Sequence, residues 1–132
     1  MPYLVDSDIV IDHLAHVEEA TALLEKLAPE GIAISIITYM ETYQGVLRSP
    51  HTELAHQQFE AFVTAFPILP FSLSTAKQCA QLRETLKKAG KRTSSRALDL
   101  LNAAIALEYN LTLVTRNGED YQDVPELKLY RL

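Results

Sequence analysis

Short apolar runs alternate with longer segments of helical periodicity along this chain. The runs are rich in β-branched residues and predict strands at Tyr3–Val5, Ile32–Ile37, Leu111–Thr115 and Leu127–Tyr130. A proline-rich run at 67–71 suits only a short edge strand. Strands separated by helical crossovers pair in parallel. The sequence therefore predicts an α/β fold, a three-layer sandwich around a central, mainly parallel sheet.

The segments between these runs carry apolar residues on one helical face. The first helix is expected to begin near Ser7 or Asp8. The remaining helices are expected at Val17–Ala28, Thr38–Arg48, Leu54–Ala65, Thr75–Ala89 and Leu98–Tyr109. Residues 91–95 form a polar connection between the last two of these helices.

Length and composition restrict the class of protein. A chain of 132 residues, 48% of them hydrophobic, has the size of one domain, so we expect residues 1–132 to form one. We expect no membrane span, because no apolar run approaches about 20 residues. The single Cys79 excludes an internal disulfide and suits a reducing, cytoplasmic location. The net charge of −5 argues against a general nucleic-acid coat but not against a nuclease.

Four acidic residues stand where a predicted strand runs out or a helix begins: Asp6, Glu41, Asp99 and Asp120. Open α/β sheets place their active sites outside the carboxyl ends of the strands. Carboxylates gathered there raise each other's pKa unless a cation neutralises them. Mg²⁺ or Mn²⁺, which prefer oxygen ligands, is the expected cation. The pattern predicts a metal-dependent phosphoryl-transfer enzyme in which Asp6, Glu41 and Asp99 hold the metal.

Each of these acids also has a purely structural explanation. Asp6 can cap the next helix, Glu41 fits the last position of a capping box, and Asp99 can complement a helix dipole. We favour a ligand role for Asp6, which ends an apolar strand, and for Asp99, because an unpaired charge in so apolar a helix is costly. The position of Glu41 just after a buried strand favours the same role. Asp8 and Asp12 are expected on a solvated helix face.

The residues after the strand at 111–115 offer neutral ligands. Thr115 and Asn117 carry oxygens that could hold a water or a phosphate group, although Asn117-Gly118 is also an ordinary turn pair. Spacing alone does not decide whether Asn117 or Asp120 completes the catalytic site, so both are candidates.

Basic residues are concentrated just before Asp99. Six of the twelve Lys and Arg residues lie between positions 83 and 96. Those on the helix, such as Arg83 and Lys87, suit a solvated face. Lys91, Arg92 and Arg96 lie in or beside the polar connection, and we expect them to contact a phosphate backbone.

Four motifs occur in the order and spacing of a known family. They are Tyr3-Leu4-Val5-Asp6-Ser7-Asp8, Glu41 after the second strand, Asp99-Leu100-Leu101-Asn102-Ala103-Ala104, and Leu113-Val114-Thr115-Arg116-Asn117 with Asp120-Tyr121. Over nearly its whole length the chain resembles the PIN-domain ribonucleases, and specifically the VapC-type toxins of prokaryotic toxin–antitoxin pairs. It departs from the family pattern at Asn117, where many relatives carry an acid.

The resemblance implies a Mg²⁺- or Mn²⁺-dependent endoribonuclease that hydrolyses structured RNA, such as a transfer or ribosomal RNA loop. Lys91, Arg92, Arg96, Arg116 and Thr115 would then contact the RNA. The family also implies a homodimer and a cognate antitoxin protein whose tail lies in an apolar groove. By analogy, the groove walls are expected around Tyr39, Tyr43, Val46 and Phe59.

Two alternatives remain open at the level of sequence. Asp6-Ser7-Asp8-Ile9-Val10 also fits the nucleophile motif of haloacid-dehalogenase-like phosphatases, in which Asp6 would be phosphorylated and Asp8 would act as acid and base. Against this, no lysine precedes an acidic pair late in the chain. The other alternative is an inactive binding module that has kept the fold and lost its metal.

Overall fold

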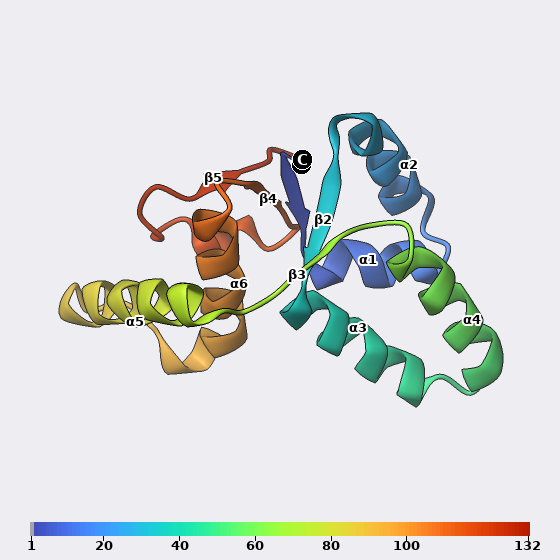
Figure 1. Cartoon of the computed structure of the whole chain (residues 1–132), viewed down its shortest axis with the longest axis horizontal. Helices are drawn as coiled ribbons and strands as arrows, with labels where there is room; N and C mark the ends of the chain where they lie inside the picture. The colour runs from blue at the N-terminus through green and yellow to red at the C-terminus, as the bar shows by residue number, and fades with distance from the viewer. Residues whose placement is uncertain (1) are drawn as a thin grey trace.

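The computed structural model describes residues 2–132, and their five strands form one parallel sheet in the order β3-β2-β1-β4-β5 (Figure 1). The strands are β1 (Tyr3–Val5), β2 (Ile32–Ser35), β3 (Ile68–Leu69), β4 (Thr112–Val114) and β5 (Lys128–Leu129). Leu4 is in register with Ala33 of β2 and with Leu113 of β4, so β1 lies at the centre. The parallel sheet is confirmed, and the proline-flanked β3 forms an edge, as predicted.

Helices cover both faces of the sheet. They are α1 (Ser7–Leu14), α2 (Glu18–Leu27), α3 (Ile36–Arg48), α4 (Thr52–Val63), α5 (Leu73–Lys88) and α6 (Ala97–Glu108), with short turns of 3₁₀-helix at η1 (Ala28–Glu30), η2 (Ser94–Arg96) and η3 (Gly118–Tyr121). In Figure 1, α5 and α6 lie on one side of the sheet, and α1, α2 and α4 on the other. The predicted three-layer arrangement is confirmed. Within residues 2–132, no helix has the length and apolar character needed to cross a membrane.

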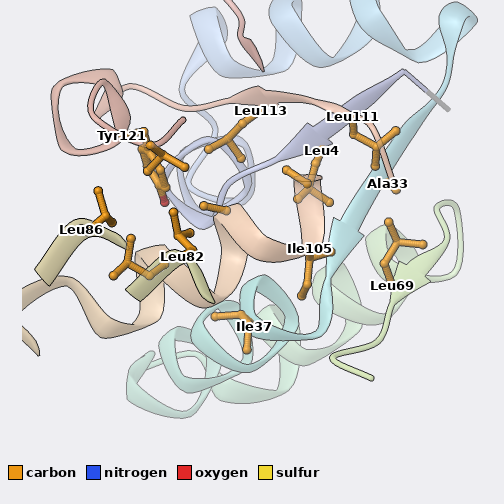
Figure 2. Packing of buried hydrophobic residues seen from close by; sticks show 14 residues of the cluster. Leu4, Ala33, Ile37, Leu69, Leu82, Leu86, Ile105, Leu111, Leu113 and Tyr121 are labelled. Carbon is orange, nitrogen blue, oxygen red and sulfur yellow. The ribbon is translucent and has the colours of Figure 1, made fainter. Parts of the chain in front are cut away.

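Alternation along the central strands divides the core between the two faces. Leu4 and Leu113 face α5 and α6, where they pack with Leu82, Leu100 and Ile105 (Figure 2). Their neighbours Val5 and Val114 face the other layer, where they pack with Ile9, Leu24 and Phe59. Because side chains alternate along a strand, strands buried on both faces carry apolar residues at successive positions. Leu4-Val5 of β1 and Leu113-Val114 of β4 are such pairs, each preceded by a partly buried residue.

The start of α3 differs from the prediction in a way that matters for Glu41. The strand β2 ends at Ser35, two residues earlier than expected, and Ser35 caps the helix by accepting a hydrogen bond from the Thr38 amide at 3.0 Å. The β-branched Ile36-Ile37 pair looks like strand, but the cap and the burial of Ile37 make it the first turn of a helix. The capping box considered for Glu41 would need Thr38 as the cap, but the cap is Ser35, so Glu41 lies in the second turn with no capping-box role. The other element ends differ by one or two residues at most.

The loop that leads into α6 is anchored by a buried guanidinium group. Arg96 is 5% exposed, and it donates to both carboxylate oxygens of Asp123, at 2.6 and 2.8 Å. It also donates to the backbone oxygens of Arg92 and Asp120, each at 2.7 Å. The guanidinium lowers the pKa of Asp123 through these hydrogen bonds. The prediction that Arg96 contacts RNA is thus replaced by a structural role, because its donors point inward and tie η3 to α6.

Replacing Arg96 with Met should therefore lower the free energy of unfolding by about 2–4 kcal/mol, because Asp123 and two backbone oxygens lose their partner. Urea unfolding followed by circular dichroism measures this change. The matched control is Arg92→Met, whose side chain is 60% exposed and should change stability by less than about 1 kcal/mol. Equal effects of the two substitutions would contradict the structural role of Arg96.

Candidate active site

Asp6 lies at the carboxyl end of the central strand and is 6% exposed. Its Oδ1 accepts hydrogen bonds from the Ser7 amide at 2.8 Å and from Asn102 Nδ2 at 3.4 Å. Its Oδ2 accepts from the Thr115 hydroxyl at 2.9 Å and from the Tyr121 hydroxyl at 3.2 Å. The donors come from α1, α6, the end of β4 and η3. Four parts of the chain thus converge on one carboxylate, and both Asp6 roles weighed from sequence, cap and site residue, occur together.

Two hydroxyl groups bridge this carboxylate to other acids. Tyr121 lies between Asp6 Oδ2 and Asp99 Oδ1, 3.2 Å from each. Thr115 lies between Asp6 Oδ2 and Asp8 Oδ2, at 2.9 and 3.2 Å. A hydroxyl group has one proton to donate, so it can satisfy only one of its two acceptors at a time. The three carboxylates therefore compete for two hydroxyl protons at a largely buried edge of the sheet.

This competition and the burial of the acids appear in their pKa values. The pKa of Asp6 is raised to about 6, mainly by burial and then by the charge of Asp8, with a smaller contribution from Asp99. Hydrogen bonds from Thr115 and Ser7 act in the opposite direction and lower it. Burial is also the main cause of the raised pKa of Asp99, partly opposed by the hydrogen bond from Tyr121. Tyr121 itself has a strongly raised pKa, mainly from burial and then from the neighbouring acids, so its hydroxyl stays protonated.

Glu41 approaches the same acids from α3. Its side chain is half-buried, and its pKa is raised by burial first and then by the charges of Asp99 and Asp8, while the Ser7 side chain lowers it. The charge of Asp99 reaches Glu41, and Tyr121 connects Asp99 to Asp6, so these three sequence-predicted acids lie around the carboxyl edge of the sheet. This is the edge at which open α/β sheets place their sites.

Asp8 belongs to this cluster, although the sequence suggested a solvated helix face. It accepts hydrogen bonds from the Ile9 amide at 2.7 Å, from the Arg116 amide at 2.9 Å and from Asn117 Nδ2 at 3.4 Å, in addition to Thr115. The signal in the sequence was its place in the first turn of a helix that begins beside Asp6. Asp8 holds the turn after β4 against α1, so it supports the site from one side of the acids.

Asn102 is a second residue that the sequence analysis did not select. It follows Asp99 by one helical turn on α6 and is 2% exposed. Its side-chain oxygen accepts a hydrogen bond from the Ser35 hydroxyl at 2.6 Å, while its amide nitrogen donates to Asp6. A polar residue three positions after an acid in an otherwise apolar helix was the available signal, because both lie on one helix face.

The two candidates for completing the site occupy different places. Asn117 is exposed and donates its side-chain amide to Asp8. Asp120 lies in η3, close enough to Asp99 to raise the pKa of that acid, and its carboxylate accepts a hydrogen bond from Arg92 at 3.3 Å. Asp120 therefore adds charge to the Asp99 side of the cluster, and Asn117 adds a neutral group to the Asp8 side.

The remaining predicted contact residues divide by exposure. Lys91 and Arg92 are exposed on the loop before α6. Arg116 is also exposed, pairs with Asp12 at 2.8 Å and lines a cavity of about 530 Å³ between α1, α2 and the C-terminal residues. Thr115 is 4% exposed with its hydroxyl directed at Asp6 and Asp8. Its predicted RNA contact is therefore corrected to a role inside the acid cluster.

The donor set suits a hard divalent cation. Among residues 2–132, no group of three or more Asp, Glu, His or Cys side chains is arranged to hold a metal ion. Mg²⁺ does not require one, because it keeps several waters and binds through one or two carboxylates. Clustered carboxylates whose pKa values are raised by burial and mutual repulsion are the environment in which such an ion is stabilising. Asp6 and Asp99, joined through the Tyr121 hydroxyl, are the two carboxylates of this cluster that suit such an ion.

Comparison with known proteins decides the family. The PIN domain family matches residues 3–127. The chain belongs to the PIN-domain family. It is 31% identical to ribonuclease VapC2 of Rickettsia felis, over 98% of this chain and 96% of that protein. A haloacid-dehalogenase-like phosphatase is not favoured by this match.

Solved PIN-domain structures agree closely with the fold. A chain of the VapBC2 complex of Rickettsia felis, solved bound to a DNA fragment from the promoter, superposes with a TM-score of 0.88 at 30% identity, covering 100% of this chain and 99% of that one. A chain of a toxin–antitoxin complex from Klebsiella pneumoniae gives a TM-score of 0.76 at 30% identity, covering 98% and 96%. The resemblance inferred from four sequence motifs is thereby confirmed.

The raised pKa of Asp6 predicts that the acid cluster destabilises the metal-free PIN domain at neutral pH. Its folded value of about 6 exceeds the unfolded value of 3.8, so the native state binds more protons between these values. The contribution of Asp6 to the free energy of unfolding is therefore most favourable below about pH 4 and is lost as the pH rises through about 6. Asp6→Asn, which stays neutral, should raise the free energy of unfolding at pH 7.5 by about 1–3 kcal/mol.

Urea unfolding in the presence of EDTA, repeated from pH 4 to pH 7.5, measures this effect. The exposed Glu119→Gln is the control for loss of one acidic charge. If the free energy of unfolding of wild type and of Asp6→Asn depended on pH in the same way, ionisation of Asp6 would not destabilise the fold.

Proposed function

We propose that this protein is a metal-dependent endoribonuclease, the toxin of a toxin–antitoxin pair, and that it hydrolyses phosphodiester bonds in structured RNA such as transfer or ribosomal RNA. The observation that carries the proposal is the Tyr121 hydroxyl held between Asp6 and Asp99, with Glu41 near Asp99, at the carboxyl edge of a PIN-domain sheet. The full-length similarity to a VapC ribonuclease supports the same activity. Residues 1–132 act as one PIN-like domain in this proposal.

Asp6, Asp99 and Glu41 would hold the cation, Mg²⁺ or Mn²⁺. When bound, the ion supplies activation of a water molecule and screening of the charge that develops on the phosphate. Asp6 is kept in place by its four donors and so offers a fixed anionic centre. Glu41 and Asp99 are half-buried acids whose pKa values are raised mainly by burial, so a bound cation would favour their ionised forms. Asn117 and Asp120 border the cluster on either side and complete the catalytic set.

Exposed cations around this acidic cluster would position the RNA. Lys91 and Arg92 precede α6, and Arg116 follows β4, so the three surround the acids from two sides. Contacts of this kind bind phosphate groups without reading sequence. Arg96 and Thr115 are left out of the RNA-binding set because both are buried.

The partners follow from the family and from one groove. Relatives of this chain are found in VapBC and other toxin–antitoxin complexes, and we assign a cognate antitoxin and a homodimer to this protein. A cavity of about 350 Å³ between α1, α3 and α4 is lined by Ile11, Leu14, Val46 and Leu54 among others. It is mainly apolar and suits the antitoxin tail. Tyr39, Tyr43 and Phe59 pack on one another beside it, with ring centroids 5.0–6.4 Å apart.

The place of action in the proposal is the cytoplasm. The free thiol of Cys79 is buried against α6, where it contacts the Leu100 carbonyl oxygen. A buried, unpaired cysteine suits a reducing compartment, in which RNA substrates are also found.

Removing any one of the three ligand acids should abolish hydrolysis. Asp6→Ala, Glu41→Ala and Asp99→Ala should each lower the rate of RNA cleavage by about 100-fold or more, because the electrostatic stabilisation of the transition state is lost. Cleavage of a transcribed transfer RNA in the presence of Mn²⁺ measures the rates, and EDTA should abolish the wild-type activity. Glu84→Ala, on the exposed side of α5, is the control acid.

Retained cleavage by folded Asp99→Ala would count against the proposal. An inactive binding module makes the opposite prediction, namely no calorimetric Mn²⁺ binding by wild type and no change on Asp6→Ala.

The basic loop makes a separate prediction about RNA binding. The double variant Lys91→Ala, Arg92→Ala should reduce the slope of log K against log salt concentration by about 0.7–0.9 for each phosphate group that the variant no longer neutralises. Binding of a labelled transfer RNA between about 50 and 200 mM salt measures the slope. The matched control is Arg83→Ala, Lys87→Ala on α5, which removes the same charge and should leave the slope unchanged. Equal slopes for all three proteins would remove the loop from the RNA interface.

A further inference from the structure

The Tyr121 hydroxyl group lies inside the site but outside the set of acids that would hold the ion. It is the only polar atom of a side chain that otherwise belongs to the apolar core, where the ring packs near Leu82, Leu86 and Leu113 (Figure 2). The residue is 1% exposed. The hydroxyl emerges from this core at the point where Asp6 and Asp99 approach each other, 3.2 Å from an oxygen of each.

The position of this hydroxyl is fixed by more than ring packing. Tyr121 ends η3, and the neighbouring Asp120 carbonyl oxygen accepts a hydrogen bond from buried Arg96 at 2.7 Å. Arg96 also holds Asp123 on the other side of Tyr121. The ring is therefore clamped by the core and its backbone by an ion pair. Such a donor is pre-organised between the two acids and donates its one proton to either of them without a change of side-chain conformation.

Asp6 and Asp99 depend on this donor to different extents. Asp6 has three further donors, from Ser7, Asn102 and Thr115. For Asp99, the hydrogen bond from Tyr121 is the one side-chain hydrogen bond found within residues 2–132. The orientation of the Asp99 carboxylate is thus set mainly by Tyr121. The Asp6 carboxylate would keep its orientation without the Tyr121 hydroxyl, because its three other donors remain.

We infer that Tyr121 is a positioning residue that holds the Asp6 and Asp99 carboxylates in register for one divalent cation. The inference rests on the proposed function and extends it to a residue outside the ligand set. Hydrogen bonds to the ligating carboxylates orient them and limit their repulsion before the ion arrives, and loss of such outer partners weakens metal binding by about 10–100-fold. Tyr121 therefore acts through Asp6 and Asp99 and touches neither the RNA nor the ion.

The test is calorimetric Mn²⁺ binding by the full chain, with no RNA present. Tyr121→Phe keeps the ring and removes only the hydroxyl, and its Kd for Mn²⁺ should rise about 10-fold or more. Tyr109→Phe removes a hydroxyl from a tyrosine at the exposed end of α6 and should bind as wild type does. Cleavage assays on the same proteins should show a lower kcat at limiting Mn²⁺ with an unchanged KM for RNA.

Rescue distinguishes positioning from a general packing role. Tyr121→p-aminophenylalanine places an N–H donor at the same position and should return the Kd to within a few fold of wild type. Wild-type affinity in Tyr121→Phe would overturn the inference and leave the proposed function standing. Absence of Mn²⁺ binding by wild type would overturn both. If Tyr121→Phe does not unfold cooperatively, its Kd cannot be interpreted, and the p-aminophenylalanine variant becomes the test. A folded p-aminophenylalanine protein that binds Mn²⁺ about 10-fold more weakly than wild type would refute the inference.

Discussion

The burial of one carboxylate, that of Asp6, is the constraint around which this molecule is organised. A charged oxygen pair that is 6% exposed is tolerated only when its lone pairs are satisfied. Here donors from α1, α6, the end of β4 and η3 satisfy it, and each of those segments must be held in place for its donor to reach. At the end of β1, the N-terminal segment is thus joined to α6, β4 and η3 by polar contacts as well as by the sheet.

The supporting interactions lie one step further from Asp6. Ser35 caps α3 and also donates to Asn102, which fixes the amide that donates to Asp6. Arg96 connects α6 to η3 and thereby places Tyr121. Asp8 binds the turn after β4 through the Arg116 amide. The Ser35 and Asn102 contacts are neutral, Arg96 is paired with Asp123, and Asp8 adds a further negative charge, so the network adds rigidity without cancelling the charge of the acids. The charge that remains is what a divalent cation would neutralise, and proteins commonly retain such strain at sites that serve a function.

Site residues could be predicted from the sequence where their local chemical context was informative. They could not be predicted where their role depends on the direction in which the side chain points. Asp6 and Asp99 stood out because a charge in an apolar run is unfavourable without a partner. Glu41 was ambiguous, because Thr38 to Glu41 has the spacing of a capping box, and only the cap at Ser35 removed that explanation. Arg96 had the composition of a phosphate contact, yet its guanidinium turns inward to Asp123, which lies 27 positions later. Asp8 and Thr115 were misjudged for the same reason, since their partners are more than 100 positions away.

The sequence by itself determined the order of strands and helices, their parallel arrangement and the edge of the sheet where acids collect. Those features depend on apolar periodicity, β-branching and the residue at each strand end, all of which act over a few neighbouring positions. Only the tertiary structure decided which side chains share a hydrogen bond at that edge. The bond from Tyr121 to Asp6 spans 115 positions, and whether it forms depends on how η3 is clamped and how α6 is rotated against the sheet. Packing of the whole core sets those rotations, so no local pattern contains them.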